Sequence, residues 1–110
     1  MPLQNGLYCV TFGTPLGQGT GVAYLSDGQL HGGDSSMFYS GSYEQNGDSF
    51  EATVRIGTHT KYADIQSVFG VPEADIQLKG QSANTTATTT GSSPQAPGIS
   101  FSARLDRIAS

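Results

Sequence analysis

The chain has 110 residues, 35% of them hydrophobic, and a formal net charge of −4 with five Lys and Arg residues. This length predicts one small domain over residues 1–110 with a modest core. So few cations argue against a nucleic-acid partner, whose phosphates are bound by clustered Lys and Arg. Fifteen Gly, five Pro and few charged residues are typical of an all-β protein with many tight turns rather than of a helical bundle.

Short segments with the composition of β-strands follow one another along the chain, joined mostly by turn residues. They are residues 6–13, 20–26, 29–33, 36–45, 48–57, 75–80, 83–89 and 99–106. Before the sixth of them, apolar residues at helical spacing predict one short helix around 61–69, which Pro72 would end. About eight antiparallel strands in this order form a meander, which hides its edges by curling into a small β-barrel or a strongly bent sheet.

The first hairpin is predicted in VAYLSDGQLHGGD, where Asp27-Gly28 separates two short runs. Its register pairs Leu25 with Leu30, Tyr24 with His31, and Ala23 with Gly32. The sequence Gly32-Gly33-Asp34 that follows is interpreted as a turn in which the aspartate accepts backbone amides, in preference to an ion site.

A second hairpin is predicted in MFYSGSYEQNGDSFEATVRI, residues 37–56, around Asn46-Gly47. This pair favours a type I′ turn, closed between Gln45 and Asp48. The resulting inner face pairs Tyr43 with Phe50, Gly41 with Ala52, Tyr39 with Val54, and Met37 with Ile56. The outer face pairs Ser42 with Glu51, Ser40 with Thr53, and Phe38 with Arg55. Because a one-residue slip would turn the apolar set toward water, the two faces are strongly specified.

The C-terminal stretch GISFSARLD alternates between apolar and polar residues. Ile99, Phe101, Ala103 and Leu105 are expected on the inner face. The residues between them are polar, as expected for a strand with one buried face.

No motif for catalysis, metal binding or cofactor binding is present in the sequence. It contains no G-x-S-x-G, H-E-x-x-H, C-x-x-C or P-loop pattern. The chain is therefore predicted to be no enzyme, with no catalytic residues, no metal site and no cofactor. Cys9 is interpreted as a small buried thiol and His31 as an ordinary exterior or interface histidine.

The sequence also predicts a cytoplasmic protein that does not enter a membrane. The start of the chain, MPLQNGLYCV, lacks the basic and apolar regions of a signal peptide, and no run approaches the ~20 apolar residues of a membrane span. Because Cys9 is the single cysteine, the fold cannot depend on an internal disulfide or an oxidising compartment.

The order of these motifs resembles the GrlR family, small negative regulators of bacterial type III secretion genes. The segments that carry the resemblance are NGLYCVTF, GQGTGVAYLSDGQLHGGDSSMFYSGSYE, DSFEATVRI and ADIQLKG, which together span nearly the whole chain. The resemblance implies a lipocalin-like β-barrel, a homodimer, and a role in binding a transcriptional activator rather than DNA or a substrate. It implies no catalysis.

The resemblance also points to a surface for the protein partner. The best-described member of the family carries Glu-Asp-Glu-Asp in the loop corresponding to residues 45–48, where this chain keeps only the charge of Asp48. Glu44 and Glu51 lie close by, so the hairpin tip is either a solvated end or a partner-binding patch. The candidate partner-binding residues are Glu44, Gln45, Asn46, Gly47, Asp48 and Glu51.

A homodimer interface is the interpretation for the apolar residues on the outer face. Phe38 points outward in the predicted register, and aromatic and Arg residues are enriched in subunit contacts. The candidate interface residues are Phe38, Arg55 and Tyr24. The alternative is that the segment 59–73 simply covers Phe38.

Two functions from different classes remain open. The first is a non-enzymatic regulator that binds a protein partner, a transcriptional activator in the resembling family. The alternative is a carrier of a small apolar ligand or lipid, because an eight-stranded barrel can hold one small molecule. An interior packed solid by Tyr39, Tyr43, Phe50, Val54, Phe101 and Leu105 would exclude the carrier.

Overall fold

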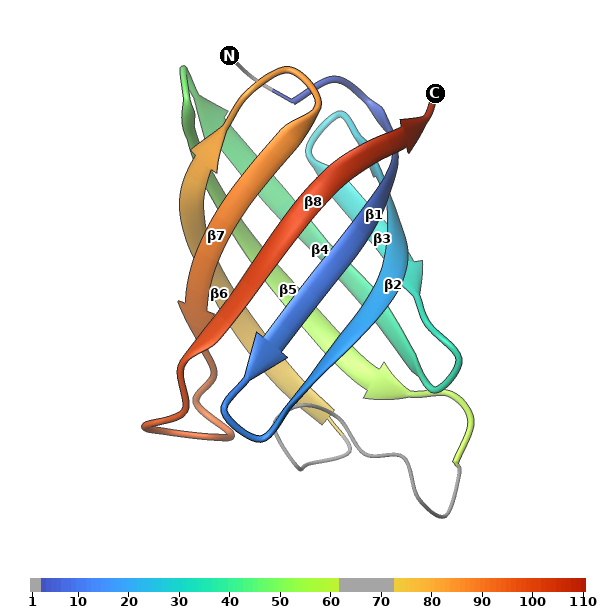
Figure 1. The fold of residues 1–110 in the computed structure, drawn as a ribbon, viewed down its shortest axis with the longest axis vertical. Coiled ribbons are helices and arrows are strands. Elements are labelled where there is room, and N and C mark those ends of the chain that lie inside the picture. The colour runs from blue at the N-terminus through green and yellow to red at the C-terminus, as the bar shows by residue number, and fades with distance from the viewer. Residues whose placement is uncertain (1–2, 62–72) are drawn as a thin grey trace.

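The computed structural model describes residues 3–61 and 73–110, which form a closed antiparallel β-barrel (Figure 1). Each strand pairs with its neighbours in the chain, and the last strand pairs with the first. The strands are β1 (Gly6–Thr14), β2 (Gly17–Ser26), β3 (Gln29–Gly33), β4 (Met37–Asn46), β5 (Ser49–Thr58), β6 (Glu73–Ser82), β7 (Thr86–Ser92) and β8 (Phe101–Ala109). The predicted all-β meander is confirmed, and the barrel is the form it takes.

No helix occurs in residues 3–61 and 73–110, and none of their segments is a helix long and apolar enough to cross a membrane. The short helix predicted around 61–69 lies, from residue 62 onward, outside the described residues.

The β2–β3 hairpin has the predicted register. Leu25 lies opposite Leu30, and Tyr24 lies opposite His31. Asp27 and Gly28 occupy the two turn positions with φ of 50° and 87°. Positive φ at both positions is the requirement of a type I′ turn, which matches the twist of the flanking strands.

The β4–β5 hairpin corrects the predicted register by two residues. Asn46 pairs with Ser49, so the turn consists of Gly47 and Asp48 instead of Asn46 and Gly47. Gly47 has a φ of 64°, and a glycine with positive φ at the first turn position is the pattern of a type II′ turn. Because side chains alternate with a period of two, the shift changes every partner but leaves the inner and outer faces as predicted.

The inner face holds the core, whose largest fully buried side chains are Tyr8, Leu25, Phe50 and Leu105. The start of β1, the end of β2 and the start of β5 meet at the end of the barrel where the two termini lie (Figure 1). Tyr43 and Phe50 stack there with ring centroids 5.6 Å apart. The chain before β1 covers this end, because the Leu3 amide donates to Gln45 Oε1 at 2.8 Å and the Tyr8 hydroxyl donates to the Gln4 carbonyl at 2.6 Å. This end of the barrel is therefore closed.

The C-terminal strand also follows its sequence pattern. Phe101, Ala103 and Leu105 are buried on the inner face, and Ile99 packs against the core just before β8 begins. Their polar neighbours face outward, so the alternation is confirmed.

Candidate functional site

The interior contains a cavity of about 720 Å³ that reaches the connection between β3 and β4. Its wall is formed largely by apolar side chains, among them Val10, Phe12, Met37, Val54, Ile76 and Leu78. This volume lies within the range of roughly 300–1,000 Å³ that is common for small-molecule sites. The barrel is therefore not packed solid, although Tyr39, Phe50, Val54, Phe101 and Leu105 all lie on the cavity wall.

Glycines of β2 account for part of this space. Gly19 pairs with Phe12 and Gly21 pairs with Val10, so both glycines take inward positions. A Cβ on Gly19 would lie 2.9 Å from the Phe12 ring, and a Cβ on Gly21 would collide with the Tyr39 hydroxyl. The two rings thus lie against the β2 backbone. An eight-stranded barrel is just wide enough for side chains to fill, so two rings held against its wall leave more of its middle free.

The cavity opens where β3 is too short to continue the wall. β3 has five residues and pairs only with residues 22–26 of β2. Residues 18–22 of β2 line the cavity consecutively, although successive residues of a strand face opposite sides of a sheet. Both sides reach the same cavity because the sheet has an edge here. We therefore infer that the cavity opens between this part of β2 and residues 34–36, which line it together.

A hydrogen-bonded pair, Asp34 and Tyr39, stands at this opening. The Tyr39 hydroxyl donates to Asp34 Oδ2 at 2.5 Å. Asp34 Oδ1 accepts from the backbone amides of Ser36 and Met37 at 2.9 Å and 2.7 Å. The predicted turn with an amide-accepting aspartate is therefore confirmed. It fixes the carboxylate against the cavity wall.

Burial raises the pKa of the Tyr39 hydroxyl, and the hydrogen bond to Asp34 and its negative charge raise that pKa further. Tyr39 is therefore a neutral phenol at any physiological pH. Its ring is also fixed by Phe12, which packs edge to face with ring centroids 5.9 Å apart.

Asp34 is the only charged residue among the described residues that line the cavity. A second contact holds its backbone, because His59 Nε2 lies 2.9 Å from the Asp34 carbonyl oxygen. A carbonyl only accepts hydrogen bonds, so Nε2 is the donor in this contact. The opening thus carries a carboxylate and a phenol, and the polar residues Gln18, Thr20, Ser35 and Ser36 line the cavity with them.

The predicted partner-binding residues lie at the opposite, closed end of the barrel, around the β4–β5 turn (Figure 1). Glu44, Asp48 and Glu51 are exposed there, and Glu44 lies directly opposite Glu51. Lys79 Nζ lies 3.8 Å from Glu51 Oε1. Gln45 takes an inward position and binds the Leu3 amide, so its side chain does not join the acids. Asn46 ends β4, and Gly47 begins the turn.

The predicted dimer residues share the outer face but are not in contact as expected. Phe38 lies opposite Gly57, with its ring over that glycine, and Arg55 lies opposite Ser40. The predicted pairing of Phe38 with Arg55 is therefore wrong, for the same two-residue shift. Tyr24 and Phe38 remain 45% and 40% exposed, and Val22, which sequence reasoning did not include, is 42% exposed.

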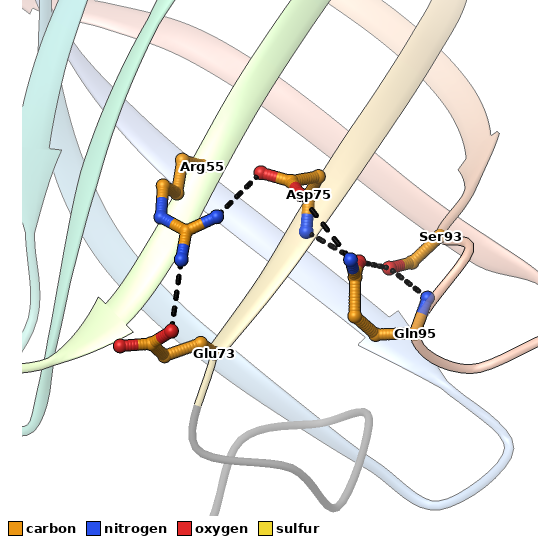
Figure 2. Close-up of polar contacts among 5 residues, drawn as sticks. All are labelled: Arg55, Glu73, Asp75, Ser93 and Gln95. Carbon is orange, nitrogen blue, oxygen red and sulfur yellow. Dashed lines mark hydrogen bonds and ion pairs between the residues drawn. The ribbon is translucent and has the colours of Figure 1, made fainter.

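Arg55 belongs to a polar network on the outside of β5 and β6 (Figure 2). Its guanidinium binds Asp75 Oδ1 at 2.9 Å and Glu73 Oε2 at 2.8 Å. The side chain of Gln95 accepts from the Asp75 amide at 2.8 Å, beyond the point where β7 stops pairing with β6. Ser93 Oγ donates to the same Gln95 oxygen at 3.0 Å. The network thus fastens the loop after β7 to the barrel wall.

No family model matches the chain, and no curated protein matches it in sequence. Within the described ranges, no three His, Cys, Asp or Glu side chains gather as metal ligands would. The class that the structure itself defines is an eight-stranded antiparallel barrel with an apolar cavity.

Sequence reasoning placed Tyr39 in the core or lumen and Asp34 in a turn, but it did not join them into a site. The two residues are five apart in sequence, and the turn between them brings the hydroxyl back to the carboxylate. A usable signal was present in β2, where glycines at 17, 19 and 21 alternate on the inner face. Alternating glycines in one strand indicate that the inner face of this part of the barrel wall carries no side chains.

We expect Tyr39→Phe to lower the free energy of unfolding by about 1–2 kcal/mol, because it removes a buried hydrogen bond to a charged group. The pKa of Tyr39 is raised in the folded state, so this contribution is complete below pH ~10 and is lost as the pH rises through the raised pKa. Denaturant unfolding at neutral and alkaline pH measures both effects. Tyr24→Phe, which removes an exposed hydroxyl, is the control, and an equal loss in the two variants would contradict the role of Tyr39.

Proposed function

We propose that the protein binds a small apolar molecule inside the barrel. The observation that carries this proposal is the cavity of about 720 Å³, lined by apolar side chains and open beside β2. Burying the apolar surface of a ligand there contributes about 25 cal/mol per Å² removed from water. An orienting polar pair, Asp34 and Tyr39, lies at the opening. Apolar walls with a few polar groups are typical of small-molecule sites.

The proposal is of a binding protein and not of an enzyme. The polar pair at the opening consists of a carboxylate and a phenol whose pKa is raised by burial, so Tyr39 is a poor proton donor at neutral pH. We place the protein in the cytoplasm, because its single cysteine is free and the fold therefore needs no internal disulfide.

The second candidate is a regulator that resembles the GrlR family and binds a transcriptional activator through the acidic turn between β4 and β5. The observation that favours it is the pair Glu44 and Glu51, which lie directly opposite each other on the outer face. Like charges at such positions destabilise a sheet, and a cationic partner bound there would offset the repulsion between the two carboxylates. Lys79 offsets only part of this charge.

This regulatory candidate includes a homodimer formed through the outer face. Val22 and Phe38 both flank Gly33 on neighbouring strands, with Tyr24 two residues along β2. The three side chains are between 40% and 45% exposed. Aromatic residues are enriched in subunit interfaces, which supports a second copy of the chain as the partner of this face.

For the carrier, we expect the neutral fluorescent probe N-phenyl-1-naphthylamine to bind with a rise in emission. Ala103→Leu, which adds volume on the cavity wall, should weaken probe binding by about tenfold or more. Ser102→Leu adds the same side chain to the exposed face of the same strand and should leave the affinity unchanged. Fluorescence titration gives the dissociation constants. Absence of probe binding to the native protein, or equal loss in both variants, would refute a cavity ligand.

For the regulator, we expect Glu44→Lys to abolish capture of a protein that the native chain retains from an extract of its own cells. The substitution removes the repulsion between Glu44 and Glu51, and it adds a positive charge that repels a cationic partner. Ser100→Lys combined with Ser102→Lys changes the net charge equally on exposed positions elsewhere and is the control. Quantitative mass spectrometry of the captured proteins compares the three baits, and identical sets would exclude the acidic turn as a binding surface.

For the dimer, light scattering at micromolar concentration should give twice the mass of one chain. Phe38→Glu places a charge in the exposed apolar group and should shift the mass to that of a monomer. Ser102→Glu, on the exposed face of β8, should leave the dimer intact. A monomeric mass for the native chain would exclude this part of the candidate.

A further inference from the structure

We propose that the ligand of this cavity is a cationic amphiphile, an apolar chain with a primary ammonium head, and that Asp34 and Tyr39 bind the head. This inference rests on the proposed carrier function and specifies its ligand class. It draws on the charge of the cavity wall and on the direction of the hydrogen bonds at its opening.

The pair at the opening offers only acceptors to a ligand. The one proton of the Tyr39 hydroxyl is donated to Asp34 Oδ2, so the lone pairs of that hydroxyl oxygen are what remain for another molecule. An ionised carboxylate has no proton to donate, and each of its oxygens can accept more than one hydrogen bond. Asp34 Oδ1 already accepts from Ser36 and Met37. Oδ2 and the phenol oxygen together therefore suit a head that donates several hydrogen bonds, as an ammonium group does.

The negative charge of the cavity wall also favours a cationic head group. Asp34 is the only charged residue among the described lining residues, and none of these is Lys or Arg. A carboxylate head, as in a fatty acid, would meet a like charge in a partly buried position, where water screens poorly. An ammonium head would instead form a charge-assisted hydrogen bond with Asp34. The formal net charge of −4 further favours the approach of a cation.

The position of the pair fits an elongated ligand. Asp34 lies in the connection between β3 and β4, at the opening, and Tyr39 is the next inward residue of β4 after Met37. The apolar wall runs from there past Val54 and Ile76 to Phe50, which lies near the closed end. A head bound by Asp34 leaves its chain directed along this wall, away from water.

The test compares three ligands with the same ten-carbon chain, namely decylamine, decanol and decanoate, in displacing N-phenyl-1-naphthylamine at neutral pH. Decylamine should displace the probe at a concentration about tenfold or more below that of decanoate, as expected for one charge-assisted hydrogen bond, with decanol between them. Asp34→Asn keeps an oxygen for the two backbone amides but removes the charge. It should reduce the preference for the amine to less than about threefold, because only the charge-independent part of recognition remains.

Asp27→Asn is the matched control, because it removes the same charge at the β2–β3 turn, at the closed end of the barrel. It should keep the full preference for decylamine. Tyr39→Phe removes one acceptor and should weaken decylamine binding more than decanoate binding, which gives a second measurement if Asp34→Asn folds poorly.

The outcomes separate this inference from the function on which it rests. Probe binding together with equal or stronger displacement by decanoate would overturn the ammonium head and leave the apolar carrier standing. Equal loss of preference in Asp34→Asn and Asp27→Asn would show a general attraction of cations and would also overturn it. Failure of the probe to bind the native protein would refute the carrier, and the inference with it.

Discussion

The pairing of β8 with β1 is the interaction on which the rest of the structure depends. It joins the two ends of the described chain along most of both strands, with one irregularity between Leu7 and Tyr8. A sheet closed in this way has a fixed circumference, so the wall cannot collapse onto missing side chains as a bent sheet could. The glycines on the inner face of β2 let the Phe12 and Tyr39 rings lie against the backbone of that strand, inside this fixed wall. Closure also pairs the first and last strands, which would be the edge strands of an open meander, and leaves short unpaired stretches such as the start of β2.

The short strand β3 interrupts the pairing of the wall beside the cavity. With only five residues, β3 ends at Gly33, and the chain must turn back to begin β4. Asp34 makes that turn by accepting two backbone amides, and its second oxygen receives the Tyr39 hydroxyl. The same residue thus satisfies the turn and brings a negative charge to the opening. The charge of Asp34 can be removed without losing the turn, because an asparagine at this position still accepts hydrogen bonds from the two backbone amides.

The strand register could be predicted from the sequence where the turn residues allowed one register, and could not where they allowed two. Asp27-Gly28 has positive φ at both turn positions, which leaves one register, and the β2–β3 pairing was predicted correctly. Around Asn46-Gly47-Asp48 two different two-residue turns are compatible with the residues, and they differ by a shift of two. The alternation of apolar residues cannot separate them, because it has the same period. The faces were therefore predictable, whereas the partners of Phe38 and Arg55 were not.

The cavity and its opening could not be predicted from the residue pattern of single strands, for a further reason. Whether a glycine row leaves space depends on rings from other strands, here Phe12 of β1 and Tyr39 of β4, which lie against the β2 backbone. The contact between Tyr39 and Asp34 also depends on where β3 ends, and strand ends are the least certain part of such a pattern. The alternation that predicts burial gives no information on volume.

The two surfaces to which functions are assigned lie at opposite ends of the same strand. Tyr39 stands near the start of β4 at the opening, and Glu44 near its end at the acidic turn. Between them β4 is paired with β5 along its whole length, and closed pairing of this kind resists bending. A ligand changes a distant surface only when it binds two conformations with different affinity. A carrier with an ammonium ligand and a regulator with a cationic partner are therefore compatible in one molecule, and each depends on its own carboxylates.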